Sequence, residues 1–192
     1  MPPKIRISKD ELTETAVRLV KENGESALNA RSVAAALNCS TQPVFSNFSS
    51  MEELRAAVIE KAYEIYLGYL KNEAESEKYP KYKAFGMAYV RFAKEEKELF
   101  KLLFMRDRTD EEQTLGPDFN ESVKMIMKAN NVSREAARLI HFEMWACVHG
   151  LGTMVATSFM QLEPDEISNI ISDVYKGVSE RYSRKENKDE RD

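Results

Sequence analysis

The sequence has few of the residues that mark disulfide-rich, metal-binding or membrane-spanning proteins. Among 192 residues there are two cysteines, Cys39 and Cys147, whose spacing does not fit a zinc site. In a chain that looks intracellular we expect them to be buried thiols rather than a disulfide. No apolar run approaches the ~20 residues that a transmembrane helix needs. Residues 1–10 lack the hydrophobic segment of a signal peptide, so we expect a cytoplasmic protein.

The chain also lacks an excess of positive charge. Its net charge is −4 and its isoelectric point is near 5.5. These values count against a protein that coats nucleic acid without regard to sequence. They leave a sequence-specific reader possible, because local potential matters more than the total.

Low glycine and proline content and an apolar period near 3.6 residues predict an all-α fold. The length fits one sizeable core or two small ones. We expect an N-terminal helix-turn-helix domain in residues 1–50, a helical body in 51–183 and a disordered charged tail in 184–192. The predicted helices cover residues 9–23, 30–37, 41–48, 51–77, 81–94, 97–105, 118–130, 134–160 and 164–181.

Residues 26–53 are the most informative stretch, because they read as two short helices joined by a tight turn. Asn38 suits the left-handed conformation that ends a helix. Ser40 suits the N-cap of the second helix, with Pro43 in its first turn. That helix presents small polar side chains on one side and apolar ones on the other, a pattern suited to a DNA major groove. Its polar residues are Thr41, Gln42, Ser46 and Asn47, and its apolar residues are Val44 and Phe48.

After this pair, Ser49 and Ser50 precede Glu52 and Glu53 in a capping-box pattern that starts a long helix. Over residues 8–58 the whole segment resembles the DNA-binding domain of TetR-family transcriptional regulators. The resemblance is carried by spacing and residue class: the stripe Leu12, Ala16, Leu19 and Val20, the turn Asn23-Gly24, and the run Val44-Phe45-Ser46-Asn47-Phe48.

The departures from the family fall at contact positions. Thr41-Gln42-Pro43 stands where the family often has Lys-Gly-Thr, and Met51 stands where a lysine is common. Ser46 and Asn47 replace a histidine and an aromatic residue. The resemblance therefore implies the fold, but it does not imply any particular operator sequence.

The predicted DNA-binding domain is only weakly positive. Through Phe48 it has six basic residues (Lys4, Arg6, Lys9, Arg18, Lys21, Arg31) and five acidic ones (Asp10, Glu11, Glu14, Glu22, Glu25). Phosphate contacts must then come from a few cations, hydroxyls and helix N-terminal amides. The predicted DNA-binding residues are Lys4, Arg6, Arg31, Ser40, Thr41, Gln42, Phe45 and Asn47.

The body is rich in aromatic residues and methionine. Most such stripes simply form core, but they also suit a cavity for a small apolar or amphipathic molecule. The segment Trp145 to Gly150 resembles the Trp-His-Gly signature of a regulatory domain in one branch of the TetR family. TetR-family proteins typically release DNA when a small molecule fills a cavity of this domain. The predicted ligand-binding residues are Tyr63, Tyr89, Phe92, Phe104, Trp145 and His149.

The last two helices are more apolar than one edge of a monomer needs. The resemblance implies that they pair two subunits in a four-helix bundle. We therefore expect a homodimer, with an interface formed by Met144, Leu151, Val155, Ile167, Ile171 and Val174.

Other chemistry is poorly supported. His141 and Glu143 diverge by about 200° on a helix, as do Cys147 and His149, so we expect no metal site. We found no phosphate loop and no nucleophile–base pair, so we expect neither an enzyme nor a cofactor. The sequence thus favours a ligand-responsive, sequence-specific DNA-binding repressor. The alternative is a helical ligand-binding or interaction protein without DNA binding.

Overall fold

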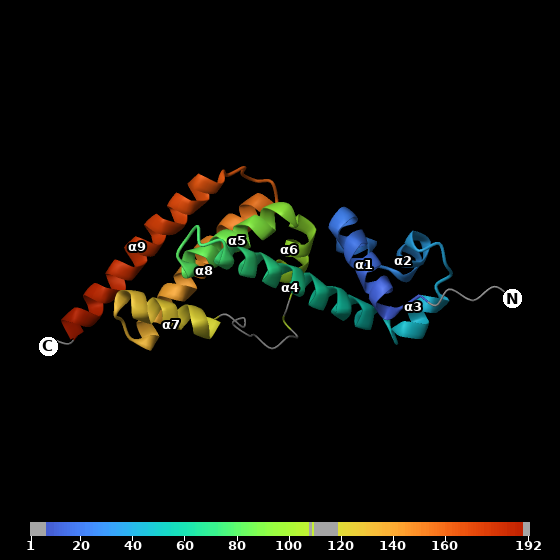
Figure 1. Cartoon of the computed structure of the whole chain (residues 1–192), viewed down its shortest axis with the longest axis horizontal. Helices are drawn as coiled ribbons and strands as arrows, with labels where there is room; N and C mark the ends of the chain where they lie inside the picture. Colours follow the sequence, from blue (N-terminus) through green and yellow to red (C-terminus); the bar gives the residue numbers. More distant parts are fainter. Residues whose placement is uncertain (1–6, 108, 110–118, 190–192) are drawn as a thin grey trace. The chain divides into compact units, whose positions relative to one another are not determined.

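The computed structural model describes residues 7–107, 109 and 119–189, and within these ranges every regular element is helical (Figure 1). The all-α prediction is therefore confirmed. None of the helices in the described ranges is long and apolar enough to cross a membrane. The elements are α1 (Lys9–Asn23), the 3-10 turn η1 (Glu25–Ala27), α2 (Ala30–Ala36), α3 (Gln42–Asn47), α4 (Met51–Glu75), α5 (Lys81–Glu95), α6 (Lys97–Phe104), α7 (Phe119–Asn130), α8 (Arg134–Ala156) and α9 (Pro164–Asp189).

The chain forms two compact units, which we call the head unit and the body unit. The head unit comprises the chain up to Gly68 together with Glu95–Arg106, and the body unit comprises Tyr69–Lys94 and the chain from Asp107 onward. The boundary expected at residue 50 differs from this division. The head unit also takes in most of α4 and all of α6.

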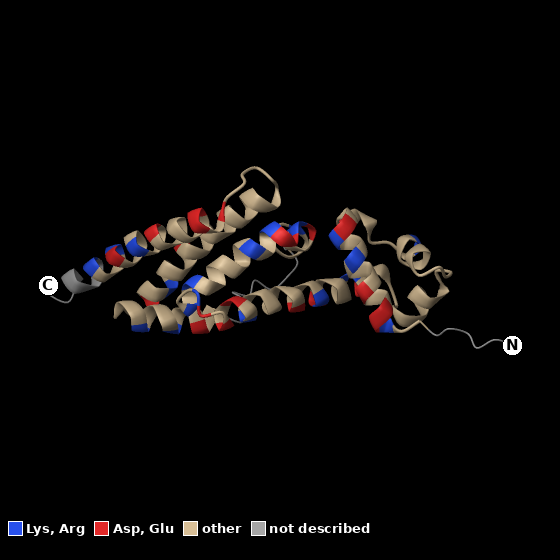
Figure 2. Cartoon of the chain, turned by 45° about the horizontal axis from the view of Figure 1, so that its top comes forward, with Lys and Arg blue, Asp and Glu red and all other residues tan. Residues whose placement is uncertain are grey.

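The head unit is built around one face of α1. A complete capping box begins this helix: the Ser8 N–H donates to the Glu11 carboxylate at 2.8 Å, and the Glu11 N–H donates to Ser8 Oγ at 3.1 Å. Leu12, Ala16 and Val20 of the predicted stripe are fully buried. Helix α1 packs against α2 and against α6. Charged residues of both signs occupy its other positions (Figure 2).

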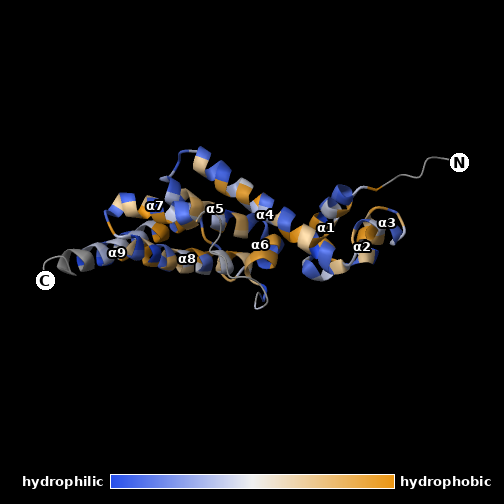
Figure 3. Ribbon diagram, turned by 90° about the horizontal axis from the view of Figure 1, so that it is seen from below, coloured by the Kyte–Doolittle hydropathy of each residue, from blue (hydrophilic) through white to orange (hydrophobic). Residues whose placement is uncertain are grey.

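In the body unit, α8 packs against both α7 and α9. Helix α5 lies close to α8 and α9 at Gly86. A Cβ at this position would lie 3.4 Å from Val148 Cγ2 of α8 and 3.4 Å from Ile171 Cδ1 of α9. Gly150 has open space at the corresponding position, so it serves no close approach within the described part of the chain. Helix α4, which runs from one unit into the other, shows alternating hydrophobic and hydrophilic segments (Figure 3).

Two helix ends differ from the prediction by more than two residues. Helix α8 ends at Ala156 rather than at residue 160, because Ser158 adopts a positive φ of 58°. Its N–H then donates to Val155 O and the Phe159 N–H donates to Met154 O, the pair of bonds that closes a Schellman motif. Helix α9 continues to Asp189, so much of the expected disordered tail is helical in the structure.

Candidate nucleic-acid interface and effector region

The turn between α2 and α3 forms as its residues predict. Asn38 has a φ of 52°, and two hydrogen bonds close a Schellman motif around it. The Cys39 N–H donates to Ala34 O at 2.9 Å, and the Asn38 N–H donates to Ala35 O at 3.1 Å. These bonds use carbonyls that α2 would otherwise leave unpaired, and they fix the exit angle toward α3.

The cap of α3 is not the one expected. Thr41 rather than Ser40 is the N-cap residue, and its side chain makes no capping bond. With Thr41 as the N-cap, Pro43 is the second helical residue and has no N–H, so the Val44 N–H is the one that a capping side chain could use. Ser40 is exposed just before the helix and remains a candidate for contact with DNA.

Helix α3 is seated on the head core by one face and exposed on the other. Val44 and Phe48 are each 1% exposed. Gln42, Phe45 and Ser46 are exposed at three- and four-residue spacings, so they share the outer face. The Ser46 hydroxyl donates to Gln42 O at 2.8 Å, which commits it to the helix backbone. The outer face therefore offers mainly the Gln42 amide and the Phe45 ring.

Asn47, a predicted DNA contact, makes hydrogen bonds within the head unit. Its Nδ2 donates to Pro43 O at 2.8 Å and to Ile7 O at 3.4 Å, and the residue is half-buried. This amide group thus joins α3 to Ile7, which precedes α1. Lys4 and Arg6, the other predicted contacts near the N-terminus, lie outside the described residues.

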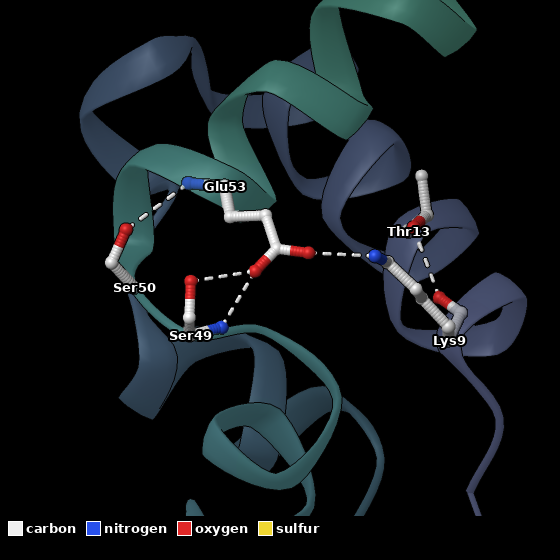
Figure 4. A network of polar contacts seen from close by, with 5 residues as sticks. All are labelled: Lys9, Thr13, Ser49, Ser50 and Glu53. Atoms are coloured by element: carbon white, nitrogen blue, oxygen red, sulfur yellow. Dashed lines mark hydrogen bonds and ion pairs between the residues drawn. The ribbon is translucent and has the colours of Figure 1, made fainter.

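A polar network joins the start of α4 to α1 (Figure 4). The Glu53 N–H donates to Ser50 Oγ at 3.3 Å, and Glu53 Oε2 accepts from the Ser49 N–H at 2.7 Å and the Ser49 hydroxyl at 2.8 Å. Lys9 Nζ pairs with Glu53 Oε1 at 2.7 Å. The Lys9 ammonium, followed by the Ser49 donors, lowers the pKa of Glu53 to about 2. The expected capping pattern is present, with Glu53 reaching back to Ser49.

Ion pairs between residues far apart in the sequence neutralise lysines of the predicted DNA-binding domain that could otherwise contact phosphate. Besides Lys9, Lys21 is paired with Glu96 of α6 at 2.6 Å. Within the described ranges Arg18 and Arg31 are exposed and form no ion pair. Of the predicted phosphate contacts that the structure describes, Arg31 is thus the cation left for a ligand.

The six predicted effector residues divide between the two units. In the head unit, the rings of Tyr63 and Tyr66 have centroids 5.7 Å apart, and Tyr66 meets Phe104 edge-on at 5.2 Å. In the body unit, Phe92 is fully buried against Tyr69, with centroids 5.3 Å apart.

Tyr89, Trp145 and His149 come together in the body unit. The Tyr89 hydroxyl and His149 Nδ1 are 2.8 Å apart, and the His149 ring stacks on Trp145 with centroids 5.1 Å apart. Burial raises the pKa of Tyr89 and lowers the pKa of His149, so both groups are held neutral near pH 7. Trp145 is 48% exposed and stacks with Phe142, which is 60% exposed. Trp145 therefore lies at the surface of the unit rather than in its interior.

The predicted dimer residues are largely already buried within one chain. Met144, Leu151 and Val155 of α8, and Ile167 and Ile171 of α9, are buried, while Val174 is half-buried. In the single chain, helices of the same chain cover these apolar faces, and the predicted interface stays a prediction. The apolar side chains that α8 leaves exposed are Leu139, Phe142, Trp145 and Met154.

The polar residues of α8 that could suggest a metal site are engaged elsewhere. His141 Nδ1 lies 3.0 Å from the Tyr82 hydroxyl. Glu143 accepts hydrogen bonds from Arg181 and from the Tyr182 hydroxyl. Within the described ranges no group of three histidine, cysteine or acidic side chains is placed to hold a metal ion.

One polar cluster was not predicted from the sequence. Lys83 of α5 donates hydrogen bonds to the hydroxyls of Ser168 and Ser172 on α9, each at 2.7 Å. Only the four-residue spacing of the two serines, which puts them on one face of a helix, hinted at a shared partner. A lysine 85 positions earlier in the chain could not be identified as that partner from local pattern.

Comparisons with known proteins show which proteins this chain is similar to. Residues 82–172 match the family model described as the tetracyclin repressor-like C-terminal domain. The structure of a TetR-like transcriptional regulator from Rhodococcus sp. RHA1 is similar, with a TM-score of 0.65 and 13% identity, over 91% of this chain and 96% of that chain. A Rhodococcus sp. RHA1 protein of unknown function has a TM-score of 0.70 and 18% identity, over 95% of this chain and 100% of that chain. No curated protein matches the chain.

Proposed function

Because residues 82–172 match the tetracyclin repressor-like C-terminal domain and the fold is similar to that of a TetR-like regulator, we propose that the chain is a TetR-like, sequence-specific DNA-binding repressor released by a small molecule. It acts as a homodimer in the cytoplasm. Helices α2 and α3 are the DNA-reading element of each subunit. The body unit holds the effector and the dimer interface.

The observation that carries the proposal is the form of α3. It is a six-residue helix that is anchored on the core of the head unit by the buried side chains of Val44 and Phe48. A hydrogen-bonded turn joins it to α2. Its outer face presents Gln42 and Phe45 to solvent. A glutamine can pair bidentately with adenine in the major groove, and an aromatic ring can contact a thymine methyl group. Because α3 is held firmly by this packing, the DNA does not have to position Gln42 or Phe45. The contacts that these side chains make can therefore be selective.

We place the dimer interface on the exposed face of α8. Leu139 and Phe142 lie three residues apart on this face, and each is more than 40% exposed in the single chain. Burying this face against a second copy removes large apolar side chains from water, which is the main favourable term in association. Two α3 helices so paired must meet major grooves about 34–36 Å apart.

We place the effector contact at Tyr89, His149 and Trp145. The three residues combine a buried hydroxyl, an imidazole and an indole, which suits a flat amphipathic molecule with one polar group. Coupling of ~1–3 kcal/mol between this site and DNA is enough for a useful response, and it must be reciprocal. Operator DNA should weaken effector binding by the same factor by which effector weakens DNA binding.

The experiment that tests the function is selection from a pool of random double-stranded DNA, followed by fluorescence anisotropy on the enriched sequence. A palindromic consensus with half-sites one helical turn apart supports a dimeric reader. Enrichment of no sequence at physiological salt would contradict DNA reading.

A second candidate function is that of a helical ligand-binding or interaction protein that does not read DNA. It is favoured by the nearly neutral charge of the head unit, in which Lys9 and Lys21 are held in ion pairs. The two candidates differ in the selection result. Saturable binding of a small molecule to a protein that enriches no DNA sequence would favour the second.

A further inference from the structure

Lys83 is held between two helices of the body unit. It lies in the first turn of α5, and its Nζ is 2.7 Å from both Ser168 Oγ and Ser172 Oγ on α9. The ring of Tyr79 lies below the ammonium, with its centroid 4.9 Å from Nζ. All four residues are half-buried, so the cluster is partly shielded from bulk water and partly accessible to it.

Two hydrogen-bond donors remain in this cluster. An ammonium has three N–H donors and no acceptor, and the two serine hydroxyls take two of them. Ser172 Oγ donates its own proton to Ser168 O at 2.9 Å. Within the described ranges the hydroxyl proton of Ser168 has no acceptor. One N–H of Lys83 and the O–H of Ser168, whose heavy atoms are 2.7 Å apart, can therefore both point at one ligand atom.

The cluster also has an unmatched positive charge. Lys83 has no carboxylate within ion-pair distance in the described part of the chain, whereas its neighbour Lys81 is paired with Glu121 at 2.6 Å. A cation withdrawn from water is costly unless a counter-charge compensates it. Lys78 lies over the same tyrosine ring, and its pKa is raised chiefly by its hydrogen bond with Tyr79 and less by the charge of Asp165. Lys83 thus supplies a positive charge that no carboxylate in the described ranges pairs, which suits a singly charged anion.

We propose that Lys83, Ser168 and Ser172 form a binding site for the carboxylate of a small organic acid between α5 and α9. One carboxylate oxygen accepts from Lys83 and from the Ser168 hydroxyl. Ser172 positions the ammonium. The site does not depend on the proposed DNA-binding function, and it is measured on the protein alone.

The packing around the site restricts the rest of the ligand. One turn along α5, Gly86 lies so close to Ile171 and Val148 that even a Cβ would be in contact, so no acyl chain passes that way. We therefore expect acids with a short aliphatic chain to bind better than acids with a long one.

The test is a titration of the ¹⁵N-labelled protein with sodium acetate and sodium propionate. Total ionic strength is kept constant with sodium chloride. We expect saturable shifts of the backbone amide signals of Tyr79, residues 81–83 and residues 168–172. Lys83→Met should weaken binding of both acids at least tenfold, because it keeps the side-chain length and removes the charge. The matched control is Lys176→Met, which removes the same charge from an exposed position of α9 and should change binding less than twofold.

Ser168→Ala provides a second variant that keeps the lysine. It should weaken acetate binding at least threefold, and it decides the question if circular dichroism shows that Lys83→Met is unfolded. Equal acetate binding by wild type and by the folded lysine variant would overturn the site, as would shifts that never saturate. Tighter binding of inorganic phosphate than of acetate at the same residues would overturn the assignment to a carboxylate.

Discussion

Phe45 is exposed to solvent and Phe48, three residues later, is buried. Replacing each by alanine therefore tests whether the packing of Phe48 holds α3 on the core of the head unit. Phe48 is 1% exposed, and the Lys9 ammonium lies 4.8 Å from its ring centroid. Removing a buried phenylalanine ring costs about 3–5 kcal/mol, and the loss of the cation–π contact adds about 0.5–1 kcal/mol. Phe45 is 55% exposed, so Phe45→Ala should change stability by no more than about 0.5 kcal/mol.

The assay is urea unfolding followed by circular dichroism, together with hydrogen exchange of the α1 and α3 amides. Phe48→Ala should lower the unfolding midpoint of the head and speed exchange of these amides. Phe45→Ala should leave both unchanged while it weakens binding to the selected DNA. Equal stability losses in the two variants, or a loss below about 1 kcal/mol for Phe48→Ala, would refute the seating of α3 on Phe48.

Three further predictions address DNA reading, pH and assembly. Gln42→Ala should cost about 1–3 kcal/mol of operator affinity and relax the preference at one base pair, and an unchanged selected consensus would exclude this residue as a reader. The folded pKa of Glu53 is about 2, below its ordinary value of 4.5, so its stabilising effect is complete above pH 4.5 and is lost as the pH falls toward 2. Glu53→Gln should therefore lower the thermal midpoint at pH 7 and make a shrinking difference as the pH falls, and a difference independent of pH would contradict the Lys9 pairing. Phe142→Glu should give monomers by light scattering, because it places a charge in the proposed interface, whereas a dimer as stable as wild type would move the interface elsewhere.

Local signals were enough to place most helix starts. The capping box of Ser8 and Glu11, and Ser133, whose hydroxyl accepts from the Ala136 N–H, act within four residues of the chain, so their effect can be read from sequence. Asn38 likewise marked the turn between α2 and α3.

The outcomes that sequence could not give depend on distant partners. Met144 and Ile171 read as interface residues, because a heptad-like apolar pattern is the same whether the covering helix belongs to the same chain or to another. The hydrogen bond from the Asn47 amide to Ile7 O joins residues forty positions apart, which local pattern cannot predict. The pairing of Lys9 with Glu53 also joins residues 44 positions apart, and it changes the charge of the predicted DNA-binding surface.

The return of α6 to the head unit has a consequence for how the chain folds. Helix α1 packs against α6, and Lys21 meets Glu96 across 75 positions that include all of α5, which belongs to the body unit. Closing a loop of that length costs roughly 4 kcal/mol of chain entropy, which later contacts must offset. During synthesis the head cannot be completed until residue 104 has left the ribosome, after the first body helix has already emerged. No single cut separates the two units, and a fragment ending at Gly68 would leave uncovered the face of α1 on which α6 packs.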